Sequence, residues 1–154
     1  MGTGSGNIAI FLKQSFPCAK VQGVDISSKA LKVACKNGRA HAPAIEFIQS
    51  ALFTTIAENT SYDIIVANLP YVPQDVQVTR EVSREPQEAI FAGNDGLDVL
   101  RAFEAQRRDK GIMFGELWLE FFPSQEKEIE KIFNTHRVDF LSDVGGVVRF
   151  AKIV

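Results

Sequence analysis

Short apolar runs alternate along this chain with stretches of helical periodicity, and this alternation constrains the fold more than any other feature. We expect strands at 21–24, 45–49, 62–67 and 117–122, and helices that begin near positions 6, 27, 95 and 123. Strands that are separated by helices pair in parallel, because each helix crosses the sheet to reach the next strand. The runs at 138–141 and 147–154 have no helix between them and predict an antiparallel pair. The sequence therefore predicts an α/β fold with a mostly parallel sheet and a C-terminal antiparallel strand pair.

Local signals predict where the helices begin and end and which faces are buried. Ser27 and Asp95 are expected to cap helices at their N-termini, and Asn37-Gly38 is expected to end the helix that Ser27 begins. The segment 72–94 has no sustained period and carries two prolines, which indicates a binding loop or lid, or else a disordered excursion. Apolar residues at helical spacing should face the core: Leu97, Leu100 and Phe103 in one helix, and Ile129, Ile132 and Phe133 in the next.

Composition limits what the chain binds and where it works. With 154 residues and a net charge of −2, it is large enough for one domain with a core and carries no broad electrostatic footprint for nucleic acid. No apolar run approaches the roughly 20 residues that span a bilayer. Cys18 and Cys35 stand in no metal-binding pattern, so we expect small core residues in a reducing, cytoplasmic compartment. His41 and His136 are isolated in polar contexts, and we expect surface positions and no metal site.

A glycine-rich loop lies immediately before the first expected helix. It reads Gly2-Thr3-Gly4-Ser5-Gly6, and its glycines let the backbone approach a ligand closely while the helix N-terminus attracts an anion. Asp25 ends the next strand about twenty residues on, where a carboxylate accepts the hydroxyls of a ribose. A dinucleotide site would require a glycine where Asn7 stands. The pattern therefore favours S-adenosylmethionine (SAM), which carries no phosphate.

A second motif, Asn68-Leu69-Pro70-Tyr71, directly follows the apolar run at 64–67. A side-chain amide, a proline and an aromatic ring at the end of a buried strand form a poor core but a suitable clamp for a planar NH2 group. The Asn68 side-chain oxygen and the Pro70 carbonyl would accept hydrogen bonds from the two N–H groups, and the Tyr71 ring would stack on the plane of the amide. Together, the two motifs predict a methyl donor and a nitrogen acceptor.

These segments resemble the class I SAM-dependent methyltransferases that modify glutamine in peptide chain release factors. The family pattern at the clamp is N-P-P-Y, and Leu69 replaces its first proline. N-L-P-Y also occurs in ribosomal RNA adenine methyltransferases, so the tetrapeptide indicates the acceptor chemistry rather than the substrate. The run E-P-Q-E-A-I-F-A-G-N-D-G-L at 85–97 indicates the release-factor group more narrowly. The resemblance covers essentially the whole chain and implies a Rossmann-like methyltransferase fold.

The resemblance also implies a role for each motif. The cofactor SAM would be held by the glycine loop, Asp25, Leu52 and Asn68. The glutamine would be held by residues 68–71, of which Asn68, Pro70 and Tyr71 would be catalytic. Related enzymes often have an acidic residue where Ala51 stands, so the adenine amino group lacks that acceptor here. Leu52 would pack on the adenine ring, or else it is simply a core residue.

Glu120 lies near the end of the strand expected at 117–122 and either faces the site or is an ordinary strand-end carboxylate. In the family, a first, central strand and an acidic residue precede the glycine loop, and a helical domain precedes that strand. We therefore expect the chain to be the C-terminal part of a longer enzyme, with Met1 an internal methionine, or else a degenerate, inactive copy.

The leading hypothesis is a SAM-dependent protein-glutamine N5-methyltransferase that acts on release factors as a monomer. One alternative is methylation of an adenine or cytosine amino group in nucleic acid, which should require basic residues around the acceptor. The loop 72–94 has only two basic residues, Arg80 and Arg84, so this alternative ranks lower. The same loop carries four acidic residues: Asp75, Glu81, Glu85 and Glu88. Another alternative is a truncated domain that binds only cofactor or a partner.

Overall fold

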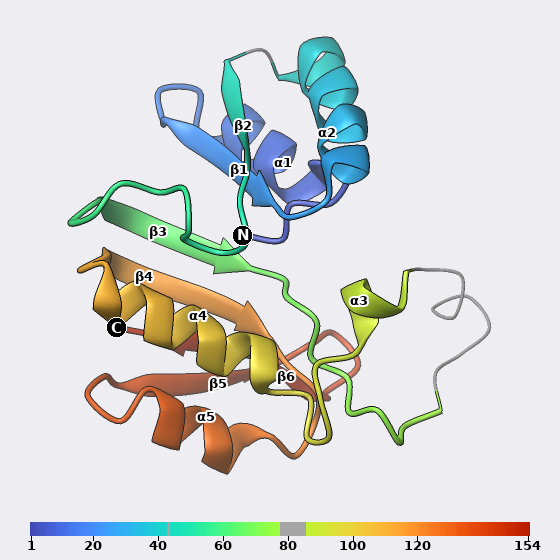
Figure 1. Cartoon of the computed structure of the whole chain (residues 1–154), viewed down its shortest axis with the longest axis vertical. Helices are drawn as coiled ribbons and strands as arrows, with labels where there is room; N and C mark the ends of the chain where they lie inside the picture. The colour runs from blue at the N-terminus through green and yellow to red at the C-terminus, as the bar shows by residue number, and fades with distance from the viewer. Residues whose placement is uncertain (43, 78–85) are drawn as a thin grey trace. The chain divides into compact units, whose positions relative to one another are not determined.

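The computed structural model describes residues 1–42, 44–77 and 86–154, and the side chain of Glu88 is also left undescribed. The chain divides into two compact units, Met1–Ala57 and Glu58–Val154. Figure 1 labels the helices and strands of both units. Among the described residues, no helix combines the length and apolar character needed to cross a membrane.

The first unit consists of two parallel strands and two helices. The strands pair in register from Val21↔Ile45 to Asp25↔Gln49, so their carboxyl ends lie at the same edge. Both helices contact this strand pair (Figure 1). In chain order the elements are α1 (Asn7–Ser15), β1 (Val21–Asp25), α2 (Ser28–His41) and β2 (Ile45–Gln49). All four were predicted from the sequence within a few residues.

The ring of Phe47 fills the space between the strands and α2. A side chain on Gly23 would place its Cβ 2.7 Å from this ring, and one on Gly38 would place its Cβ 2.9 Å from it. Gly38 was expected to end the helix, but α2 continues to His41. The glycine instead makes room for Phe47. Ser27 caps the helix as predicted, because its Oγ accepts a hydrogen bond from the Ala30 N–H at 3.2 Å.

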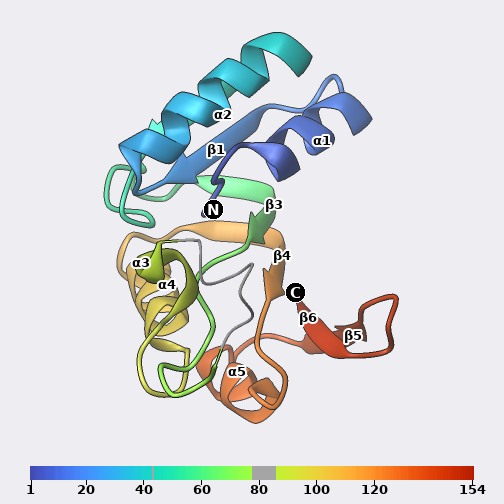
Figure 2. The ribbon, with the colours of Figure 1, turned by 90° about the vertical axis from the view of Figure 1, so that its right-hand side faces the viewer.

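The second unit is built on a mixed sheet with the strand order β3-β4-β6-β5. β3 and β4 are parallel, whereas β6 is antiparallel to both β4 and β5. Its elements are β3 (Ser61–Ala67), α3 (Gln87–Ile90), α4 (Asp98–Asp109), β4 (Met113–Glu120), α5 (Glu126–Ile132), β5 (Val138–Ser142) and β6 (Val148–Ile153). Figure 1 shows α4 running along β4, and Figure 2 shows the same elements from the side. The predicted α/β fold with a C-terminal antiparallel pair is confirmed.

The core of the second unit is formed by the expected helix faces. Phe103 of α4 and Ile129 of α5 are fully buried, as is Phe133 just after α5. Ile132 is only half-buried. On the sheet, Leu117 lies beside Ile153 in the register of β4 and β6, and both are fully buried.

Several boundaries and positions differ from the predictions. The helix expected from Asp95 begins at Asp98, because the Asp95 carboxylate accepts from the Leu97 N–H and pairs with Arg101 instead of capping the helix. β4 begins four residues before the predicted position and ends at Glu120. Cys18 is exposed and Cys35 only half-buried, so neither is the small core residue that was expected.

Among the described residues, the strand connectivity leaves four edge strands, β1 and β2 in the first unit and β3 and β5 in the second. β1 pairs with β2 only, and β3 pairs with β4 only. Within the described residues, no strand pairs with the other edge of β1 or of β3.

Replacing Gly23 with alanine should destabilise the first unit, because its new methyl group would overlap the Phe47 ring. We expect a loss of about 1–3 kcal/mol in the free energy of unfolding, measured by urea titration. Gly145→Ala in the exposed turn between β5 and β6 is the control and should change stability by less than about 0.5 kcal/mol. Equal effects at the two positions would contradict this account of the core.

Candidate functional site

The glycine loop adopts a conformation that only glycine takes easily. Gly2, Gly4 and Gly6 have φ angles of 66°, 54° and 88°, all in the left-handed region. The loop leads directly into α1, whose N-terminus has no side-chain cap. The first N–H groups of α1 are therefore available to an anionic or polar ligand.

Asp25 organises this loop as well as standing at the end of β1. Its Oδ2 accepts a hydrogen bond from the Gly4 N–H at 2.8 Å, and its Oδ1 accepts one from the Ser27 N–H at 2.9 Å. Its main-chain carbonyl accepts from the Ser50 N–H at 3.0 Å. The loop, β1 and the segment after β2 are thus joined at one residue. Each carboxylate oxygen keeps capacity for a further donor, such as a ribose hydroxyl.

The segment after β2 presents Leu52 rather than burying it. Leu52 is half-buried and has a φ of 57°, a left-handed conformation that is uncommon for a leucine. The next residue, Phe53, takes the core position, with 1% of its surface exposed. The interpretation of Leu52 as simply a core residue is therefore wrong. Its packing on an adenine ring stays a prediction.

Together, these groups fit a nucleoside-type cofactor. Uncapped N–H groups suit a carboxylate, the Asp25 carboxylate suits a diol, and Leu52 supplies an apolar surface. Ala51 is exposed and offers no side-chain acceptor. All of these residues lie at the carboxyl ends of β1 and β2, where open α/β sheets bind their ligands.

The clamp lies at the carboxyl end of β3 in the second unit. Asn68 is exposed, Leu69 is buried, and Pro70 and Tyr71 are half-buried. Among the residues that the structure describes, the Asn68 side chain and the Pro70 carbonyl form no hydrogen bond. Two acceptors are therefore available at this edge of the sheet, as the sequence predicted from these residue types.

Tyr71 is held by Glu120, which ends the neighbouring strand β4. The Tyr71 hydroxyl donates a hydrogen bond to Glu120 Oε1 at 2.9 Å. Glu120 is thus more than an ordinary strand-end carboxylate, because it fixes the direction of the tyrosine ring. The register Ala67↔Leu119 brings these two strand ends side by side.

Gln125 fixes the main chain of the clamp, and sequence reasoning missed it. Its side-chain Nε2 donates to the Tyr71 carbonyl at 3.0 Å and to the Asp95 carbonyl at 2.7 Å. Its Oε1 accepts from the Phe122 N–H at 2.9 Å. Only 5% of Gln125 is exposed. A polar residue directly after the Pro123-Ser124 turn was the only signal in the sequence, and it resembled an ordinary helix start.

Gly96 leaves space for this amide. Its φ is 74°, and a Cβ at this position would collide with the Tyr71 carbonyl and lie 2.7 Å from Gln125 Nε2. Directly after the clamp, the Val72 N–H donates a hydrogen bond to the Ile90 carbonyl at 3.0 Å. The chain that follows the clamp therefore pairs with the run that also contains Gly96. Residues 86–97 of the run singled out in the sequence therefore act as a scaffold for the clamp, whereas Glu85 lies outside the described residues.

An ion pair beside this scaffold holds its turn in place. Arg101 donates a hydrogen bond to Asp95, and this bond keeps the pKa of the Asp95 carboxyl below its usual value. Both side chains are more than two-fifths exposed, so the pair orders the turn more than it stabilises the unit. Behind the clamp, a cavity of about 10 Å³ has room for about one water molecule. The clamp therefore packs closely on its support.

Comparison with known proteins identifies the family. A family described as "Methyltransferase domain" matches residues 1–85. This chain belongs to that methyltransferase family. A release factor glutamine methyltransferase of Deinococcus radiodurans is 31% identical over 99% of the methyltransferase chain and 55% of its own length. A ribosomal protein uL3 glutamine methyltransferase of Xanthomonas campestris is 45% identical over 75% of the chain and 39% of its own length.

Solved structures show the same fold at low sequence identity. A ribosomal protein L11 methylase from Lactobacillus delbrueckii has a TM-score of 0.67 and 19% identity, covering 99% of the methyltransferase and 66% of that chain. TrmK of M. capricolum, solved with S-adenosyl-homocysteine, has a TM-score of 0.59 and 13% identity, covering 99% of the chain and 58% of its own. The methyltransferase chain spans about half the length of the curated relatives reported above.

Replacing Gln125 with alanine should loosen the clamp, because the Tyr71 and Asp95 carbonyls would lose a shared buried donor. We expect faster amide hydrogen exchange over residues 68–76 and a loss of about 1–3 kcal/mol in the free energy of unfolding. Gln87→Ala is the control, since the Gln87 side chain is exposed and forms no hydrogen bond among the described residues. Unchanged exchange in the Gln125 variant would show that the clamp does not depend on this amide.

Proposed function

We propose that this chain carries the catalytic region of a SAM-dependent methyltransferase that modifies the side-chain amide nitrogen of glutamine in peptide chain release factors. The observation that carries the proposal is the pair of acceptors at the clamp, the Asn68 side chain and the Pro70 carbonyl, which bind no other described residue and lie beside a tyrosine fixed by Glu120. Their chemistry suits a planar NH2 group with two protons to donate.

The first unit would hold the methyl donor. The glycine loop and the N-terminus of α1 would bind the amino-acid end of SAM, Asp25 the ribose, and Leu52 the adenine ring. When bound, SAM supplies an electrophilic methyl group on a sulfonium. Relatives of this fold that were solved with S-adenosyl-homocysteine support this choice of cofactor.

The second unit would hold and orient the acceptor. An amide nitrogen is a poor nucleophile, because its lone pair is delocalised into the carbonyl group. The Asn68 side-chain oxygen and the Pro70 carbonyl would accept hydrogen bonds from its two N–H groups, fix its direction and increase the electron density on nitrogen. Positioning of this kind can supply roughly 7–11 kcal/mol. No side chain need remove a proton before transfer, since the proton can leave afterwards.

Two protein substrates are candidates, and each has support from a relative. The release-factor enzyme of D. radiodurans matches nearly the whole chain, whereas the uL3 enzyme of X. campestris has the higher identity over a shorter region. Both names specify glutamine, which supports a protein amide over a base of nucleic acid. Arg80 and Arg84, the basic residues considered for a nucleic-acid substrate, lie outside the described residues. Parallel assays with a release factor and with uL3 would separate the two substrates.

Replacing Asn68 with alanine should slow methyl transfer to the protein substrate at least about 100-fold, because the acceptor loses its orienting group. SAM affinity should stay within a few fold. The assay is transfer of labelled methyl from SAM to a release factor and, separately, to uL3. Asn134→Ala, at an exposed position after α5, is the control. Near-full turnover by the Asn68 variant would remove the clamp from the mechanism.

Replacing Asp25 with alanine should weaken SAM binding by about 1.5–3 kcal/mol, because the ribose loses an ionised acceptor and the glycine loop loses its anchor. Asp25→Asn keeps one acceptor oxygen and should have a smaller effect. Calorimetric titration with SAM measures both, with Asp109→Ala as a control of equal charge change. Unchanged affinity in the alanine variant would place the cofactor elsewhere.

A further inference from the structure

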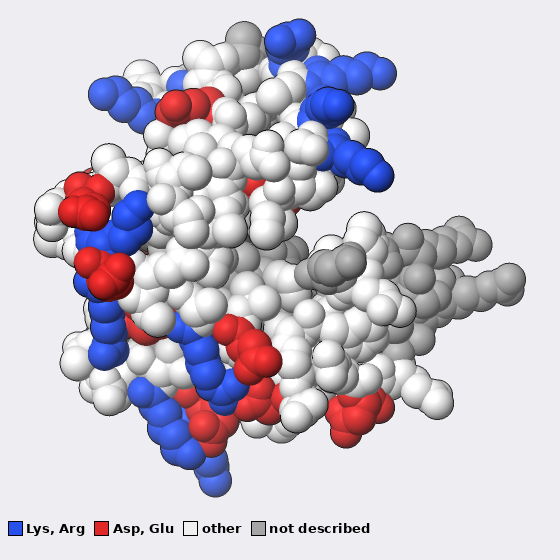
Figure 3. Space-filling model, in the orientation of Figure 1, with Lys and Arg blue, Asp and Glu red and all other residues white. Residues whose placement is uncertain are grey.

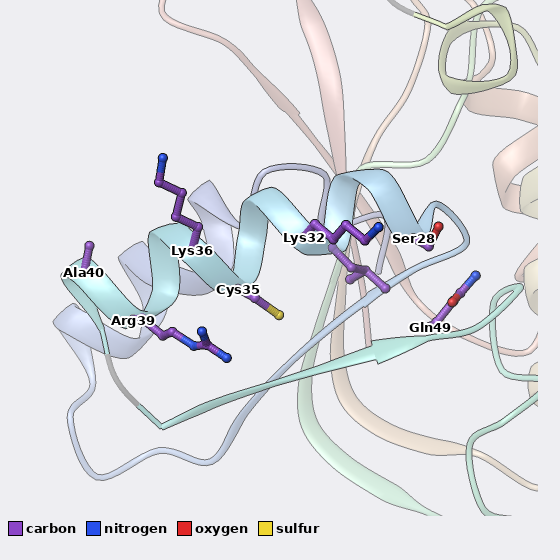
Figure 4. Close-up of a pocket in the computed structure, with 8 residues that line it drawn as sticks. Ser28, Lys32, Cys35, Lys36, Arg39, Ala40 and Gln49 are labelled. Atoms are coloured by element: carbon purple, nitrogen blue, oxygen red, sulfur yellow. The ribbon is translucent and has the colours of Figure 1, made fainter.

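An open groove of about 650 Å³ runs between α2 and β2, entirely within the first unit (Figure 4). Its lining comes from α2, except for Gln49 at the end of β2. Neither the glycine loop nor Asp25 lines it. The groove is therefore a separate surface from the proposed cofactor site, and the proposed function gives it no role.

The groove is bordered by basic side chains on a helix that contains no acidic residue. Lys32, Lys36 and Arg39 are exposed on α2, a helix that contains no aspartate or glutamate. Among the described residues, none of these three cations forms an ion pair. Figure 3 shows basic side chains gathered over α2. Since the whole chain has a net charge of −2, this is a local concentration of positive charge.

The floor of the groove is apolar. Leu31, a lining residue of the groove, is 8% exposed. The Cys35 thiol points toward β2 (Figure 4). The Arg39 guanidinium also points toward β2, whereas Lys36 points away from it (Figure 4). The surface thus combines an apolar floor with cations on its border. A ligand that matches it must carry both an apolar side chain and negative charges.

We propose that this groove docks a carboxylate-rich segment of the protein substrate, one in which acidic residues flank an apolar side chain. The choice of the substrate protein as partner rests on the proposed function. The acidic residues would pair with Lys32 and Arg39, and the apolar side chain would contact Leu31 and Cys35. Through such a contact, the enzyme would recognise its substrate protein by a surface other than the glutamine that is methylated.

The same features argue against an RNA strand. A phosphate backbone gains nothing from an apolar floor, and no aromatic residue lines the groove to stack a base. An acidic, partly apolar polypeptide matches both the border and the floor.

The test is a charge reversal with a matched control. Lys32→Glu/Arg39→Glu should weaken binding of a fluorescently labelled release factor about tenfold in an anisotropy titration at low salt. Lys20→Glu/Lys127→Glu changes the net charge equally at exposed positions outside the groove and should leave the affinity nearly unchanged. Added salt should weaken binding of the unaltered chain and narrow the difference between the two variants.

Cys35 gives a direct reading of groove occupancy. In a Cys18→Ser variant it is the only cysteine, so its reaction with a thiol reagent reports on the groove alone. Bound release factor should slow this reaction several-fold, and the charge reversal should remove the protection. This reading does not depend on methyl transfer.

Equal affinity of both double variants, or unprotected Cys35 in the complex, would overturn the docking proposal. Binding of a single-stranded RNA oligonucleotide that protects Cys35 better than the release factor would also overturn it, in favour of nucleic acid. The proposed function fails separately, if no glutamine is methylated although the release factor still protects Cys35.

Discussion

The clamp, which we propose as the acceptor site, depends on one buried amide, that of Gln125. Its nitrogen binds the carbonyls of Tyr71 and Asp95, and its oxygen binds the amide that follows β4. Three segments that are distant in sequence are thereby fixed to one another before any ligand arrives. A clamp that works by positioning needs this rigidity, since orientation is worth several kcal/mol only when it is set in advance. Gly96 makes the arrangement possible, because any side chain there would displace the amide.

Asp25 has the corresponding role in the first unit. Its carboxylate holds the Gly4 and Ser27 amides, and its carbonyl holds Ser50, so one residue joins every segment of the candidate cofactor site. Both sites lie where parallel strands end, which follows from the rule that open α/β sheets bind ligands at their carboxyl edge. In each unit, then, a polar side chain sets the loop geometry and leaves other groups free for the ligand.

Much of the fold could be predicted from the sequence, because periodicity and strand length are local properties. Every expected strand and each long helix is present, and Phe103, Ile129 and Phe133 are buried as their spacing implied. The failures concern residues whose role is set by distant partners. Gly38 makes room for Phe47 instead of ending α2, and Asp95 binds Arg101 instead of capping α4. The clamp and the loop were predicted from residue type and stay predictions, whereas the support from Gln125 could not be predicted, since the two carbonyls that its Nε2 binds are 30 and 54 positions away.

The central claim is that the clamp presents a glutamine amide nitrogen for methylation. The most direct measurement uses SAM with a deuterated methyl group, a release factor as substrate, and mass spectrometry of the digested product. The account predicts the label on the side-chain nitrogen of one glutamine, which would release deuterated methylamine on acid hydrolysis. Label on another side chain, or on the adenine of an added RNA with the protein unmodified, would contradict it.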